Sequence, residues 1–168
     1  MQPIRIRQVK KEIRVLGVAA AERGGLTRVI GAVFRGGLWL DGVLSSVAED
    51  LDLTRAIVEM VNGSPHRGQV RVIMLRAELL PRGAKVDPVK IFSETSKPVI
   101  ILGAKDMAET SPSPNIGYFT WGRGVDAVEV AYTGIRERDA GVILKVSTRD
   151  DSNPEVLRVA GLILDALP

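Results

Sequence analysis

Residues 13–21 run Ile-Arg-Val-Leu-Gly-Val-Ala-Ala-Ala and are soon followed by Gly24-Gly25. The apolar, β-branched start and the small residues after it predict a buried strand that enters a tight turn. In open α/β sheets, ligands and catalytic acids gather beyond the carboxyl ends of the central strands. Here that end carries alanines. The stretch therefore predicts a central strand of this kind of sheet, but no catalytic acid at its end.

The first part of the chain predicts an antiparallel meander of three strands. The second and third strands are joined by Gly36-Gly37, a two-residue hairpin signal. The three segments with strand patterns are residues 13–21, 27–35 and 38–47.

The rest of the chain alternates strands and helices. Asp52 and Asp87 each precede a segment with apolar residues at helical spacing, and both are predicted to be helix N-caps. Residues 103–124, rich in glycine and proline, predict a long irregular connection. Strands are predicted at 69–75, 97–102 and 127–133, and helices at 53–61, 88–96, 136–148 and 154–167, the last capped by Asn153.

Three antiparallel strands followed by right-handed βαβ crossovers predict a ribonuclease-H-like α/β fold, with a mixed central sheet flanked by helices. In that arrangement the strands at 13–21 and 69–75 lie side by side, and their carboxyl ends converge. No internal repeat or linker interrupts the chain, so residues 1–168 are predicted to form a single domain.

Composition excludes several kinds of chemistry. The chain has no cysteine and one histidine, His66, which excludes disulfides, thiolate ligands and multi-histidine metal sites within one chain. No apolar run approaches the roughly 20 residues of a membrane span, and no signal-peptide core follows the N-terminus, so we expect a cytoplasmic protein. The net charge of +3 permits nucleic-acid binding without demonstrating it. Abundant arginine and few amides are typical of a thermophile.

Several motifs, in consistent order along the chain, resemble the archaeal endonuclease V-like family of unknown function, of the UPF0215 type. The resemblance covers most of the chain and is weakest between residues 103 and 124. The motifs are Gly17-Val18 with its turn, residues 33–43 (Val-Phe-Arg-Gly-Gly-Leu-Trp-Leu-Asp-Gly-Val), residues 69–75 (Gln-Val-Arg-Val-Ile-Met-Leu), Lys97-Pro98-Val99-Ile100, and residues 153–160 (Asn-Pro-Glu-Val-Leu-Arg-Val-Ala).

The resemblance implies a fold similar to endonuclease V, and it implies where a metal site would lie. In better-preserved members the first strand ends in two aspartates and the fourth in Asp-Gly, carboxylates suited to hold Mg²⁺ for phosphodiester cleavage. In this sequence Ala19 and Ala20 stand at the first pair, and Arg76 stands at the aspartate of the fourth strand. The resemblance therefore implies that the metal site is lost and that Arg76 occupies its place, paired with Asp52 or Glu78.

The nearby acids have two interpretations. Asp52 and Asp87 match acidic positions of the family, and with Asp50 they are candidates for displaced catalytic ligands. Each of the first two is also explained by helix capping alone, which is the preferred interpretation. His66 is predicted to be an exposed loop residue, and Trp39 and Phe92 are predicted to be core residues.

Basic and aromatic side chains supply the candidate nucleic-acid contacts. The N-terminal run of basic residues predicts a solvated strand edge, with a nucleic-acid arm as the alternative. Tyr118, Phe119 and Trp121 either stack on bases, pack on the sheet or form a dimer contact. Arg35 can instead hold loop carbonyls or pair with Asp41. The predicted phosphate contacts are Arg35, Arg71, Arg76, Arg82 and Arg123, and the basic run is Arg5, Arg7, Lys10, Lys11 and Arg14.

Three functions follow from these observations. The preferred one is an endonuclease V-like protein that binds DNA, RNA or a protein partner without cutting and needs no cofactor. The second is an active Mg²⁺-dependent endonuclease that uses displaced carboxylates. The third is a structural protein that forms a homodimer through residues 103–124.

Overall fold

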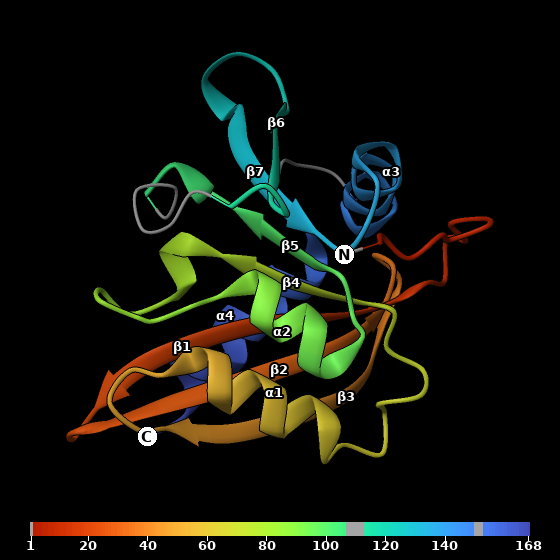
Figure 1. Cartoon of the computed structure of the whole chain (residues 1–168). Coiled ribbons are helices and arrows are strands. Elements are labelled where there is room, and N and C mark those ends of the chain that lie inside the picture. Colours follow the sequence, from red (N-terminus) through yellow and green to blue (C-terminus); the bar gives the residue numbers. More distant parts are fainter. Residues whose placement is uncertain (1, 107–112, 150–152) are drawn as a thin grey trace.

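The computed structural model describes residues 2–106, 113–149 and 153–168. Their strands form a seven-stranded sheet in the order β3-β2-β1-β4-β5-β7-β6 (Figure 1). The strands are β1 (Arg14–Arg23), β2 (Leu26–Arg35), β3 (Trp39–Ala48), β4 (Val72–Arg76), β5 (Val99–Leu102), β6 (Gly117–Trp121) and β7 (Val128–Thr133). The helices are α1 (Leu53–Asn62), α2 (Pro88–Thr95), α3 (Glu137–Ser147) and α4 (Glu155–Ala166), with short 3₁₀ turns η1 (Ala77–Leu79), η2 (Ala104–Asp106) and η3 (Gly124–Asp126).

The predicted ribonuclease-H-like arrangement is confirmed by the strand pairing. β1, β2 and β3 form the antiparallel meander, and β1 pairs in parallel with β4 at the sheet centre. β4 in turn pairs in parallel with β5, so the carboxyl ends of β1, β4 and β5 share one edge of the sheet. We call this edge the carboxyl edge, and the opposite edge, where these three strands begin, the amino edge.

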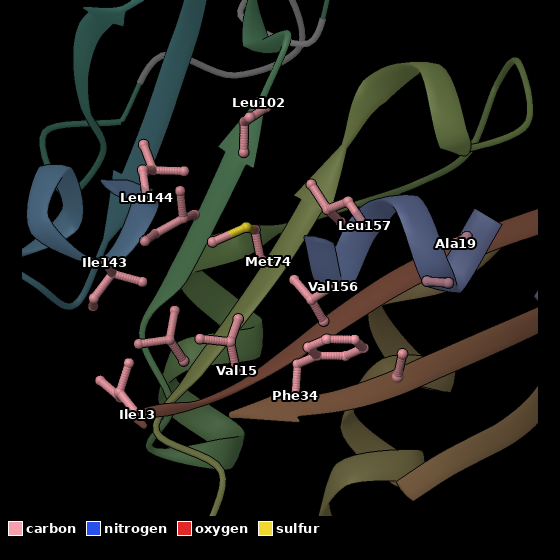
Figure 2. Close-up of a cluster of buried hydrophobic side chains, with 14 of the residues drawn as sticks. Ile13, Val15, Ala19, Phe34, Met74, Leu102, Ile143, Leu144, Val156 and Leu157 are labelled. Atoms are coloured by element: carbon pink, nitrogen blue, oxygen red, sulfur yellow. The ribbon is translucent and has the colours of Figure 1, made fainter. Parts of the chain in front are cut away.

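Two apolar cores hold the helices on the two faces of the sheet. α3 and α4 cover one face, and α1 and α2 cover the other. Successive residues of β4 point to opposite faces, so Met74 enters the first core while Leu75 enters the second. Figure 2 shows Met74 in the first core with Leu157 of α4 and Ile143 of α3.

Gly17 allows α4 to lie directly on the central strand. A Cβ at this position would stand 2.7 Å from Cγ2 of Val156 and 2.9 Å from the Val156 carbonyl oxygen. Because one of these neighbours is backbone, the helix would have to move to admit a side chain. The glycine therefore fixes the start of α4 close above β1.

The structure corrects the prediction for residues 103–124. Gly117–Trp121 form an edge strand, β6, which pairs with β7, and residues 107–112 lie outside the described ranges. The strand alternates between more and less exposed residues, as an edge strand does. Because the strand is short and lies between turn-forming residues, its alternating pattern cannot be recognised from the sequence alone.

Three single-residue predictions were also wrong. Trp39 is 48% exposed rather than core, because β3 is an edge strand, and its ring lies under the Arg35 guanidinium at 5.3 Å. His66 is half-buried, and its imidazole covers Gly42. Asn153 does not occupy the N-cap position of α4, which belongs to Pro154. Phe92, by contrast, is buried as predicted.

Candidate functional site

The candidate site of the sequence analysis lies at the carboxyl edge, where β1 and β4 run side by side. Their register pairs Val18 with Leu75, and the next residues along the two strands are Ala19 and Arg76. Ala19 is buried in the core under α4, and Ala20 is buried in the core under α1 and α2. Both methyl groups serve packing, so the part of β1 that lies beside the end of β4 presents no polar side chain to a ligand.

Arg76 is the charged group at the end of β4. Its side chain is 15% exposed, and its Nη1 donates a hydrogen bond to Oδ1 of Asn153 at 3.0 Å. Its Nε lies 3.9 Å from Oε2 of Glu78, which is 74% exposed, so this ion pair is weak. Of the two predicted partners, Glu78 is confirmed, while no ion pair to Asp52 occurs within the described residues.

Arg76 and Asn153 also form part of the wall of a hollow of about 330 Å³ beside α4. Leu157 and Gly161 of α4 supply apolar wall, and Glu78 and Asp165 bring carboxylates to its rim. The hollow is small and mixed in charge. The contact between Arg76 and Asn153 links the end of β4 to the residue before the N-cap of α4, a link that the spacing in the sequence does not reveal.

Asp52 and Asp87 lie at the carboxyl edge as helix N-caps, as predicted. Oδ1 of Asp52 accepts a hydrogen bond from the backbone N–H of Arg55 at 3.1 Å, and Oδ1 of Asp87 accepts one from Lys90 N–H at 3.1 Å. Oγ1 of Thr54 accepts a hydrogen bond from the N–H of Asp87 at 2.8 Å. This bond holds the starts of α1 and α2 side by side, with both carboxylates engaged in capping.

The donor set at this edge does not fit the Mg²⁺ ion that the endonuclease V-like resemblance implies. Mg²⁺ takes hard oxygen ligands, typically carboxylates, in near-octahedral geometry. Across residues 2–106, 113–149 and 153–168, no three histidine, aspartate or glutamate side chains gather closely enough to hold a metal ion. The charged group at the end of the central strand is instead the Arg76 guanidinium.

The five arginines predicted to contact phosphates do not lie together. Arg76 ends β4, Arg82 is exposed in the loop after η1, and Arg123 is exposed in the β6–β7 turn beyond the end of β5, so all three belong to the carboxyl edge. Arg35 lies opposite the first residue of β1, and Arg71 immediately precedes β4. These two belong to the amino edge.

Of the roles predicted for Arg35, pairing with Asp41 is confirmed. Its Nε lies 2.7 Å from Oδ2 of Asp41, and Nε of Arg14 lies 3.0 Å from the same oxygen. The hydrogen bond from Arg35, together with the one from Arg14, lowers the pKa of the Asp41 carboxyl despite its burial. The cross-strand neighbour Arg14 was not predicted, because it follows only from the β1–β2 register.

The aromatic cluster of residues 118–121 packs largely onto the sheet. Phe119 meets Tyr132 of β7 with ring centroids 5.7 Å apart, and Phe119 and Trp121 contact the core under α3 and α4. Tyr118, on the opposite face of β6, is exposed. Of the three predicted roles, packing on the sheet is therefore confirmed for Phe119 and Trp121, and dimerisation stays a prediction.

Comparison with known proteins places this architecture among endonuclease V-like proteins with a ribonuclease-H-like fold. The crystal structure of endonuclease V from Bacillus subtilis aligns with a TM-score of 0.57 at 12% identity, covering 90% of this chain and 78% of that one. A protein of unknown function from Archaeoglobus fulgidus aligns with a TM-score of 0.73 at 22% identity, covering 91% and 96% of the two chains.

The sequence itself defines the family more narrowly. The family model described as Endonuclease dU matches residues 11–111, and the chain belongs to this family. A UPF0215 protein of Methanothermobacter thermautotrophicus is 37% identical over an alignment that covers 97% of this chain and 91% of the relative. The resemblance inferred from the motifs is thereby confirmed. In the part of the chain that the structure describes, no helix is long and apolar enough to cross a membrane.

Proposed function

We propose that this chain is a nucleic-acid-binding member of the Endonuclease dU family that has lost the metal-dependent cleavage site of the fold. The observation that carries the proposal is the composition of the carboxyl edge. Ala19 and Ala20 are buried in β1 beside the end of β4, and Arg76 stands at the end of β4, where the family resemblance places acids.

Electrostatics argue against a divalent cation at that position. A guanidinium repels Mg²⁺ and supplies no lone pair for coordination. Asp52 and Asp87, the nearest candidates for replacement ligands, already accept hydrogen bonds from the starts of α1 and α2. A metal ion that took the capping Oδ1 of either carboxylate would compete with a bond worth about 1 kcal/mol.

Nucleic-acid binding, in contrast, is compatible with the side chains present. Arginine donates paired hydrogen bonds to phosphate oxygens without needing a metal ion. The chain is basic overall, and the names of its family and of its structural neighbour endonuclease V refer to enzymes that act on nucleic acid. We therefore propose that the chain still binds nucleic acid but no longer cleaves it.

A combined binding and cleavage assay tests the proposal. Labelled strands containing deoxyuridine or inosine, and matched normal strands, are incubated with the protein in Mg²⁺, in Mn²⁺ and in EDTA. We expect binding that weakens steeply with salt and no cleavage in any of these conditions. Cleavage with Mg²⁺ or Mn²⁺ that EDTA abolishes would contradict the proposal.

Asp52→Asn and Asp87→Asn separate the two interpretations of these acids. Asparagine caps a helix about as well as aspartate, so each variant keeps the helix start and removes one negative charge. If the chain cleaves and either variant abolishes cleavage, the active endonuclease with displaced carboxylates is the correct function. If the acids are caps alone, both variants bind nucleic acid as the wild type does.

A further inference from the structure

A second hollow, of about 840 Å³, lies at the amino edge, far from the site inherited with the fold. The N-terminal segment forms one side of it, and the starts of β1, β4 and β5 form the other. Figure 1 shows this segment, in red, on the side of the molecule opposite the β1–β2 hairpin. The cationic side chains that line the hollow are Arg5, Arg7, Lys10, Arg14, Arg71 and Lys97, and the acidic one is Glu12.

The N-terminal segment is attached to the body of the protein. The N–H of Ile4 donates to the Gly134 carbonyl at 2.8 Å, and Ile6 and Val9 pack against the core under α3 and α4. The basic side chains of the segment therefore face a defined surface. From sequence this basic run has two interpretations, a solvated strand edge and a nucleic-acid arm.

Lys97 gives the hollow its most unusual feature. The residue is half-buried at the entry to β5, and burial, together with the charges of Arg71 and Arg67, lowers the pKa of its amine. Within the described ranges, no ion pair includes Lys97, Arg71 or Arg67. Arg14, on the same edge, is paired with Asp41.

Neighbouring cations that form no ion pair are unfavourable in the isolated chain, and a bound anion relieves both their repulsion and the desolvation of Lys97. The ligand chemistry follows from the lining. Guanidinium and ammonium groups recognise phosphate oxygens, and among the described residues that line the hollow there is no aromatic side chain on which a base would stack. The volume also exceeds what one phosphate group needs.

We propose that the hollow at the amino edge binds the phosphodiester backbone of a nucleic-acid strand, with Arg71 and Lys97 at its centre. This inference rests on the proposed function and deepens it, because it places the main phosphate contact on the edge opposite the inherited site. Backbone contacts of this kind position a strand without reading its sequence.

Two matched double variants test the placement. Arg71→Gln with Lys97→Gln removes two charges from the amino edge, and Arg82→Gln with Arg123→Gln removes two from the carboxyl edge. Binding of a labelled single strand of about 12 nucleotides is followed by fluorescence anisotropy over a salt series. We expect the first variant to bind about tenfold more weakly or worse, with a salt slope smaller by about 1.4, and the second to bind nearly as the wild type does.

Two controls separate a loss of folding from a loss of charge. Thermal unfolding verifies that each double variant is folded, and Arg71→Lys with Lys97→Arg keeps both charges and is expected to restore most of the binding. Equal weakening by the two Gln double variants, or a larger loss from the carboxyl-edge variant, overturns this inference while the proposed function stands. Absence of binding by the wild-type chain overturns both.

Discussion

The charged groups beside the central strands are arranged differently at the two edges of the sheet. At the carboxyl edge Asp52 and Asp87 cap helices and Arg76 bonds to Asn153, so these three groups are engaged within the protein, whereas Arg82 and Arg123 are exposed. At the amino edge Arg71 and Lys97 lie close together, and no ion pair of the described residues includes either one. Open α/β folds usually hold their ligands at the carboxyl edge. In this chain, neighbouring cations without an ion-pair partner lie at the amino edge instead.

The largest effect on stability is expected at Gly17, which sets the packing of α4 on β1. Gly17→Ala places a methyl group against the Val156 backbone and should cost about 2–3 kcal/mol of unfolding free energy, measured by urea denaturation. Gly141→Ala in α3 is the matched control, because nothing lies within 4 Å of its added Cβ and alanine favours the helix. Equal stability of the two variants would contradict the close packing of α4 on β1.

A smaller effect is expected from the paired part of the amino edge. Asp41→Asn weakens the bonds to Arg35 and Arg14 and should cost about 1–2 kcal/mol at neutral pH. Because the pKa of Asp41 is lowered from 3.8 in the folded state, its contribution is present above pH 3.8 and is lost as pH falls through the folded value. Urea denaturation across this acidic range should show the wild type losing more stability than Asp41→Asn. Parallel curves would contradict the assignment.

The capping role of Asp52 predicts a cost of about 1 kcal/mol for Asp52→Ala and little change for Asp52→Asn. Chemical denaturation of the two variants measures the difference. Metal addition provides the control: Mn²⁺ should leave the melting temperature of wild type and both variants unchanged. A melting temperature that rises with Mn²⁺ in the wild type alone would show that Asp52 is a ligand.

The smallest effect on stability is expected at the unpaired centre of the amino edge. Lys97→Met removes a half-buried amine with a lowered pKa, so stability should stay constant or rise by less than about 1 kcal/mol. The same substitution should weaken nucleic-acid binding. A loss of stability with unchanged binding would mean that the lysine serves packing rather than an anionic ligand.

The fold was largely predictable, because hydrophobic periodicity, the Gly36-Gly37 hairpin and the acidic N-caps are local signals. The position of Trp39 was not, since residue type does not tell which face of an edge strand is covered. The cluster of Arg71 and Lys97 was not predictable either. These residues are distant in sequence and meet only because β4 and β5 begin side by side.

Backbone-amide NMR of the full chain, titrated with a single-stranded oligonucleotide, compares the two edges most directly. The account predicts that the largest shift changes fall on residues 5–14, 69–71 and 97, with little change at residues 19–20, 76 and 82. Changes concentrated at the carboxyl edge, with the amino edge unaffected, would contradict it.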